Sequence, residues 1–140
     1  MYYLIYMSTA TRLLSDDDLK EVLATSRTYN LTYNITGILL YSDGIFIQLL
    51  EGDEQAVTEL FVKKIKNDTR HKNIIEVVTG DTNARSFPDW SMGFMAPKAE
   101  ELKTLQGYIN PQQINLERDE APPLPLTILK TFVENNSFTA

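Results

Sequence analysis

Two apolar runs joined by Asp43-Gly44 constrain the fold of this chain more than any other feature. The runs cover residues 35–42 and 45–50, and only the Asp-Gly pair separates them. Such a pair accepts positive φ at both central positions of a two-residue hairpin turn. The sequence therefore predicts an antiparallel pair of strands, and the segments on either side of it must supply the rest of the fold.

A helix is predicted before the hairpin. Ser15 precedes three aspartates, and a hydroxyl caps free backbone amides while carboxylates stabilise the positive end of the helix dipole. Steps of four residues then place Val22, Ser26 and Asn30 on one stripe of this helix. A second helix is predicted after the hairpin. It opens at Gly52-Asp53, ends near residues 67–68, and has an apolar stripe of Val57, Leu60, Phe61 and Ile65.

Strand patterns complete the order of elements. Residues 2–7 are aromatic and apolar, residues 74–78 form a fourth run, and Trp90, Met92 and Phe94 alternate along a fifth. The order β-α-β-β-α-β-β predicts an α+β fold of the ferredoxin-like type. We expect a five-stranded mixed sheet with two helices on one face.

The character of the chain changes at Lys98. A short helix is predicted to end at Ile109, and an acidic stretch then leads to the helix-breaking prolines of residues 122–125. A last amphipathic helix is then predicted from Leu126, Leu129, Phe132 and Val133. We expect one domain over residues 1–97 and a C-terminal helical tail over residues 98–140 that packs on the open face of the sheet.

Composition narrows the classes of function. Thirteen basic and nineteen acidic residues give a net charge of -6, which disfavours nucleic acid as a partner. The chain has no cysteine, and its single histidine, His71, has no second histidine for a metal site. No apolar run reaches the length of a membrane span, so we expect a cytoplasmic protein. The usual catalytic constellations are missing, and we expect no enzyme activity.

Three polar residues could carry chemistry, and each has a plain structural alternative. Gln48 lies among apolar neighbours, where an unpaired amide costs about 1–3 kcal/mol, so it bonds either to the core or to a ligand. Tyr6 could be an ordinary core tyrosine. Asn30 could cap the C-terminus of its helix in a left-handed conformation.

Five motifs in order resemble those of the BLUF family of blue-light sensors, and the resemblance covers about residues 1–97. Each motif is weak alone, but their order and spacing together are specific to that family. They are Leu4-Ile5-Tyr6-Met7-Ser8, the run from Ile35 to Tyr41, the run from Phe46 to Gly52, Asp68-Thr69-Arg70-His71, and the run from Phe87 to Met92.

The resemblance implies FAD with its ring between the two helices. It implies that Tyr6 is the redox-active tyrosine, that Gln48 bridges it to the flavin, and that Asn30 bonds the polar edge of the ring. The other residues implied near FAD are Val22, Ser26, Phe46, Asp68, Arg70 and His71, and those implied to respond to light are Trp90 and Met92. Lys64 matches a basic position near a flavin carbonyl only when counted back from Asp68, because one extra residue lies between Phe61 and Ile65. A π-bulge could absorb this residue.

The resemblance therefore implies a blue-light photoreceptor. Excitation would draw an electron and a proton from Tyr6, and a changed Gln48 hydrogen bond would give a reversible red-shifted state that controls a protein partner not named by the sequence. Homo-oligomers are a further candidate form of assembly. The alternative is a flavin-free ferredoxin-like interaction module. A hydrolase on the same fold would need an anion cradle, for which Arg12 is the only candidate.

Overall fold

The protein is represented by a computed structural model, which describes residues 1–88, 91–96, 108 and 124–135. The predicted order of elements is confirmed. The elements are β1 (Tyr2–Ala10), α1 (Asp16–Thr32), β2 (Thr36–Ser42), β3 (Ile45–Gly52), α2 (Glu54–Glu59), a π-helical segment (Leu60–Ile65), β4 (His71–Asp81), β5 (Gly93–Met95) and α3 (Leu124–Asn135).

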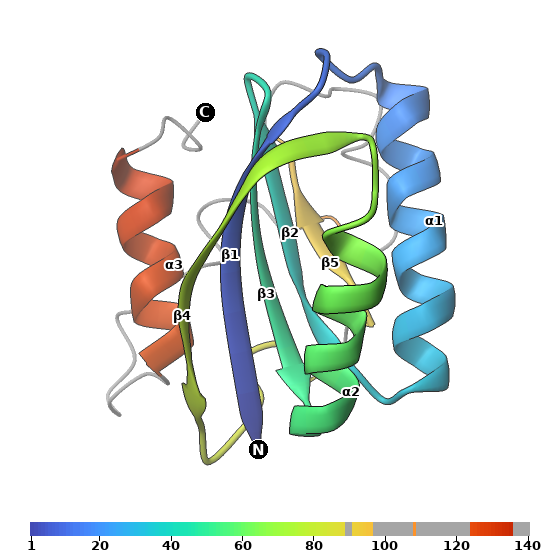
Figure 1. The fold of residues 1–140 in the computed structure, drawn as a ribbon. Coiled ribbons are helices and arrows are strands. Elements are labelled where there is room, and N and C mark those ends of the chain that lie inside the picture. The colour runs from blue at the N-terminus through green and yellow to red at the C-terminus, as the bar shows by residue number, and fades with distance from the viewer. Residues whose placement is uncertain (89–90, 97–107, 109–123, 136–140) are drawn as a thin grey trace.

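The five strands form one sheet in the order β4-β1-β3-β2-β5. The pair β2 and β5 is parallel and the other pairs are antiparallel, so the sheet is mixed as predicted. Helices α1 and α2 lie on one face of the sheet, and α3 lies on the other (Figure 1). The ferredoxin-like expectation is confirmed, with β5 added beside β2.

The hairpin between β2 and β3 fixes the position of Gln48. Asp43 and Gly44 both have positive φ, 51° and 83°, as a two-residue turn of this type requires. From this turn the register runs back to place Leu39 opposite Gln48, and β1 places Tyr6 opposite Gln48 on the other side. Directly opposite residues in a sheet point to the same face. Tyr6, Gln48 and Leu39 therefore share the face that the two helices cover.

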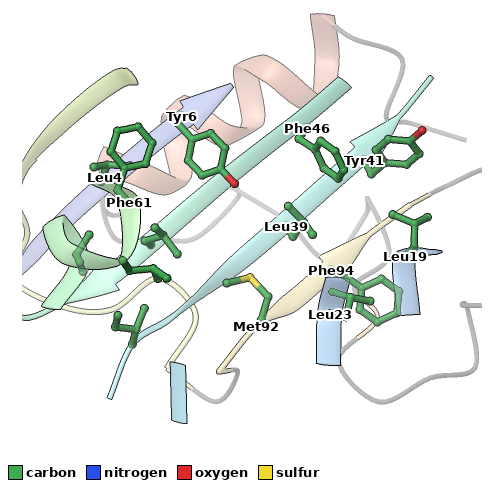
Figure 2. Packing of buried hydrophobic residues seen from close by; sticks show 14 of the residues in the cluster. Leu4, Tyr6, Leu19, Leu23, Leu39, Tyr41, Phe46, Phe61, Met92 and Phe94 are labelled. Carbon is green, nitrogen blue, oxygen red and sulfur yellow. The ribbon is translucent and has the colours of Figure 1, made fainter. Parts of the chain in front are cut away.

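Alternation along the strands divides the buried side chains into two clusters. Leu4 and Tyr6 belong to the cluster under α1 and α2, and Tyr3 and Ile5 belong to the cluster on the opposite face. Leu129 of α3 is fully buried in the second cluster. Figure 2 shows part of the first cluster, with Tyr6 and Phe61 at one end and Leu23 and Phe94 toward the other.

Several boundaries differ from the prediction. Strand β4 is longer than residues 74–78 and has two register shifts against β1, which blurred its alternation. Strand β5 begins at Gly93, so Met92 precedes the strand. The predicted contributions of Trp90, of the helix before Ile109, and of the side chains of Leu126, Phe132 and Val133 lie outside the described residues.

The connection from β4 to β5 is anchored to the end of β3 by Glu51. This carboxylate is fully buried, and it accepts hydrogen bonds from the backbone N–H of Ser86 at 2.6 Å and of Phe87 at 3.2 Å. The Thr36 hydroxyl donates a third bond at 3.3 Å. Burial raises the pKa of Glu51, although these hydrogen bonds act in the opposite direction. Glu51 thus holds the loop that leads to Met92.

The substitution Glu51→Gln should destabilise the fold by about 1–3 kcal/mol, because one amide NH2 would replace an oxygen that only donors face. Urea unfolding followed by circular dichroism would measure the change in the free energy of unfolding. Glu76→Gln is a matched control, since Glu76 is an exposed carboxylate on β4. Equal stability of the two variants would contradict the anchoring role.

Candidate functional site

A cavity lies between α1, the second helical segment and the sheet. Nine of the ten residues predicted to contact a cofactor line it, which brings together parts of the chain far apart in sequence. The lining residues are Tyr6, Val22, Ser26, Asn30, Leu39, Phe46, Gln48, Leu60, Ile65, Asp68, Arg70 and His71. The α1 stripe of Val22, Ser26 and Asn30 thus faces this cavity, as its spacing requires.

A buried chain of hydrogen bonds crosses the floor of the cavity. The Tyr6 hydroxyl donates to Gln48 Oε1, and Gln48 Nε2 donates to Met92 Sδ at 3.5 Å. All three side chains are at most 4 % exposed. A thioether sulfur can only accept, so the amide nitrogen must face Met92 and the amide oxygen must face Tyr6. The contacts therefore define the orientation of the Gln48 amide.

The environment of Tyr6 keeps its proton in place. Burial raises the pKa of Tyr6 well above that of an exposed tyrosine, and the negative charge of Asp68 raises it further. The ring packs against Phe61 at a centroid distance of 5.4 Å and against His71 at 6.1 Å. Tyr6 is therefore a neutral phenol whose hydroxyl donates its proton in a hydrogen bond to Gln48 Oε1.

The two polar atoms of the Asn30 side-chain amide differ in their hydrogen bonds. Its Nδ2 donates to the backbone oxygen of Ser91 at 2.6 Å, which fixes the orientation of the amide. Its Oδ1 is buried and has no hydrogen-bond partner among the described residues. Because a buried acceptor without a partner is costly, this atom is suited to an N–H donor from a ligand in the cavity.

The helix-capping alternative for Asn30 does not hold. Helix α1 continues to Thr32, and Tyr33 follows as its C-cap. The left-handed conformation is adopted instead by Asn34, which has a φ of 54°. Asn30 is 1 % exposed and belongs to the cavity.

An ion pair between Asp68 and Arg70 forms another part of the wall. Arg70 Nη2 and Asp68 Oδ2 are 2.6 Å apart, and Arg70 Nε and the Arg70 backbone N–H also donate to the carboxylate. Burial alone would raise the pKa of Asp68, but the bonds from Arg70 outweigh it and lower that pKa. The pair places a rigid guanidinium beside the cavity, which suits recognition of oxygen-rich or anionic groups.

His71 is held by two hydrogen bonds. Its Nε2 lies 2.6 Å from the backbone oxygen of Ile65, and its Nδ1 lies 2.8 Å from the Ser8 hydroxyl. A carbonyl oxygen accepts only, so Nε2 carries a proton and donates to it. The Ser8 hydroxyl can then donate to Nδ1. The ring is fixed at the end of the π-helical segment.

Lys64 stands apart from the other predicted contacts. Its side chain is exposed and does not line the cavity. The expected π-bulge is present as the π-helical segment Leu60–Ile65, which accommodates the extra residue between Phe61 and Ile65. In this geometry Ile65 lines the cavity and Lys64 points to solvent.

Three lining residues were missed as site residues. Leu60 and Ile65 were assigned to the apolar stripe of the second helix, and Leu39 was assigned only to a strand. Leu39 could have been found, because it lies opposite Gln48 across a two-residue turn. The contact of Arg27 Nε with the Met92 backbone oxygen, at 3.2 Å, had no signal in the sequence.

Among the described residues, no helix is long and apolar enough to cross a membrane. The same residues contain no group of three His, Cys, Asp or Glu side chains that could hold a metal ion. The wall of the cavity instead combines apolar side chains with amide, phenol and guanidinium groups. Such a wall suits an organic ligand with a flat ring and a polar edge.

Comparisons with known proteins agree with this geometry. The family model of BLUF, described as sensors of blue-light using FAD, matches residues 1–93. The photoactivated adenylate cyclase subunit beta of Euglena longa is 38% identical over 90 residues, which are 64% of this chain and 10% of that protein. The chain therefore corresponds to a small part of the curated relatives that it matches.

Solved structures of similar size also match. BlrB, a BLUF protein in its dark state, has a TM-score of 0.66 and 32% sequence identity, with 93% of this chain and 90% of that chain covered. BlsA in its photo-activated state has a TM-score of 0.65 and 34% identity, with 73% of this chain and 74% of that chain covered.

The fold and the cavity define a small α+β ligand-binding domain. The match over residues 1–93 then places it: the chain belongs to the BLUF family of blue-light sensors, and its cofactor is FAD. The residues present fit this group, because Asn30 Oδ1 is a buried acceptor without a partner among the described residues. Val22, Leu39 and Phe46 supply apolar walls of the same cavity.

Proposed function

We propose that this chain detects blue light through Tyr6 and Gln48 and passes the change to a protein partner without converting a substrate. The observation that carries the proposal is the buried chain from the Tyr6 hydroxyl through the Gln48 amide to Met92 Sδ. This chain joins an oxidisable phenol, an amide with two distinct ends, and the residue that precedes β5. It is arranged to convert a proton movement into a change of hydrogen bonds.

In this proposal Asn30 Oδ1 accepts from the polar edge of the flavin ring, and Val22, Leu39 and Phe46 contact its faces. The ribityl and phosphate side of FAD would contact Ser26, His71 and the Asp68–Arg70 pair. Lys64 is left out of the contacts, because its side chain is exposed. Bound FAD would supply absorption of blue light and, once excited, an acceptor for one electron and one proton.

The protein's own part of the step begins at Tyr6. Because burial and Asp68 disfavour the phenolate, the electron leaves from the neutral phenol of Tyr6. The oxidised phenol is acidic, and its proton moves toward Gln48 Oε1, which accepts its hydrogen bond. When the electron and the proton return, Tyr6 is restored and there is no net oxidation. The lasting change is at Gln48. Its amide group either rotates or tautomerises, with Oε1 gaining one proton and Nε2 losing one, and Nε2 no longer donates to Met92 Sδ.

We propose that the change at Gln48 is transmitted to the partner through Met92, β5 and the tail. We propose that this chain acts on a protein partner in the cytoplasm, with homo-oligomers as one form of contact. Trp90 is proposed to respond with Met92, and residues 98–140 are proposed to form the helical tail.

Absorption spectra before and after blue illumination test the proposal. Protein expressed with sufficient FAD should show a flavin spectrum that shifts slightly to the red and recovers in darkness. A bound flavin that bleaches or stays unchanged would contradict the hydrogen-bond switch. Reproducibly colourless protein would contradict flavin binding by this chain and favour an interaction module.

The red shift should persist in alkaline solution. An exposed tyrosine ionises near pH 10, but the pKa of Tyr6 is raised by burial and by Asp68. Tyr6 therefore remains protonated and able to donate to Gln48 as the pH rises through 10. The amplitude of the shift, measured between pH 7 and about 10 with flavin release monitored in parallel, should stay constant. A loss of amplitude near pH 9 with flavin still bound would contradict the buried, neutral phenol.

A further inference from the structure

Helix α1 holds the backbone just before β5 through two side chains one turn apart. Asn30 Nδ2 donates to the backbone oxygen of Ser91 at 2.6 Å, and Arg27 Nε donates to that of Met92 at 3.2 Å. Residues three apart on a helix project to the same side. The segment of Ser91 and Met92 is therefore tied to the helix that lines the cavity.

Met92 is held at both ends. Its sulfur accepts from Gln48 Nε2 and its backbone oxygen accepts from Arg27, while its side chain is 1 % exposed. Among the described residues, strand β5 pairs with β2 at three positions, from Gly93 to Met95. Because this ladder is short, the position of Met92 depends strongly on its hydrogen bonds with the side chains of Gln48 and Arg27.

The Arg27 guanidinium also contacts the ring of Phe94 in β5. Its Cζ lies 5.8 Å from the centre of the Phe94 ring, within the range of a cation–π contact. Phe94 in turn meets Tyr108 edge to face at a centroid distance of 5.4 Å, and the two residues share a parallel bridge. Figure 2 shows Met92 and Phe94 on the same face of the sheet as Tyr6. Contacts thus run without a gap from Gln48 to Tyr108.

We infer that Arg27 is a positioning residue that couples the state of Gln48 to β5 and Tyr108. The inference rests on the proposed function, in which Gln48 Nε2 leaves Met92 Sδ after illumination. Met92 then loses the anchor on its side chain but keeps the anchor on its backbone. The resulting movement of Met92 passes through Arg27 to Phe94. Without Arg27, the backbone of Met92 would lack this connection to Phe94, and less of the movement would reach β5.

Two variants of the full chain with FAD test this inference. Arg27→Met removes both the donor and the charge at similar length, and Arg27→Lys restores a charge that can donate. Arg12→Met is a matched control, because Arg12 is an exposed arginine paired with Asp18. Each variant is measured for flavin content, for the red shift, and for hydrogen exchange of peptides that contain Gly93–Met95 in the dark and under light.

Arg27→Met should bind FAD and show the full red shift. Its light-induced change in exchange at β5 should fall by about threefold or more, within the range that mutations along a coupling path produce. Arg27→Lys should recover part of this response, and Arg12→Met should match the wild type. A purely structural role would lower flavin content or the red shift together with the response at β5.

The outcomes separate the two proposals. If the wild type binds FAD but shows no red shift, the proposed function fails. If the wild type shifts and Arg27→Met keeps the full light response at β5, the function stands and the inference about Arg27 is overturned. Loss of the red shift in Arg27→Met, without rescue by Arg27→Lys, would also overturn it, because Arg27 would then act on the cavity itself.

Discussion

Replacing Tyr6 with phenylalanine should leave FAD bound and abolish the light-induced red shift. Phenylalanine keeps the ring contact with Phe61 but has no hydroxyl to donate to Gln48 Oε1. It is also a much poorer source of an electron and has no acidic proton to give. The switch of Gln48 would then lack its driving step. Illumination of the purified variant should give no red shift within the detection limit of a difference spectrum.

Tyr3→Phe is the matched control for this prediction. Tyr3 is also a buried tyrosine of β1, but it belongs to the cluster on the opposite face of the sheet. Its variant should keep the full photocycle. Tyr6→Phe also leaves Gln48 Oε1 without its donor, and we expect a loss of about 1–3 kcal/mol in stability. A normal red shift in Tyr6→Phe would refute the role assigned to Tyr6.

The fold could be predicted because its signals are local. The Asp43-Gly44 pair and the Ser15 cap each depend on a few neighbouring residues, and the structure confirms both. The two-residue turn also sets the register of β2 and β3, so the helix-covered face of the hairpin follows from alternation. The length of β4 was harder to predict, because two register shifts against β1 break the alternation on which a strand prediction depends.

The site was only partly predictable, because its contacts join distant segments. Spacing placed Asn30 on the stripe with Val22, but nothing in the sequence showed that its partner would be the backbone of Ser91, 61 residues away. The Glu51 anchor on Ser86 and Phe87 is equally invisible, since backbone N–H groups leave no mark in a sequence. Resemblance to a family supplied the roles that pattern alone left open.

Lys64 illustrates how one inserted residue changes a site. The sequence showed the extra residue between Phe61 and Ile65 but could not decide which side of it keeps the register. In the structure, the π-helical turn determines the register: Lys64 is exposed and Ile65 lines the cavity. The oxygen of Ile65, the last residue of this segment, accepts from His71 Nε2.

Replacing Asn30 with leucine should weaken FAD binding by about 10- to 100-fold, the range expected when a buried polar contact is lost and its partner is left unpaired. Leucine has similar bulk but no acceptor at Oδ1 and no donor for the Ser91 oxygen. Titration of the apoprotein with FAD, followed by flavin fluorescence, would measure the change in Kd.

Thr28→Ala provides the control on the same helix, because Thr28 is exposed and its hydroxyl bonds to the Ala24 oxygen one turn earlier. This variant should bind FAD as the wild type does. Asn30→Asp separates the two ends of the amide, since it keeps an acceptor toward the cavity but places an oxygen against the Ser91 oxygen. If the ligand contact dominates, Asn30→Asp should bind FAD better than Asn30→Leu. If both bind as the wild type does, Asn30 Oδ1 is not the atom that recognises the flavin.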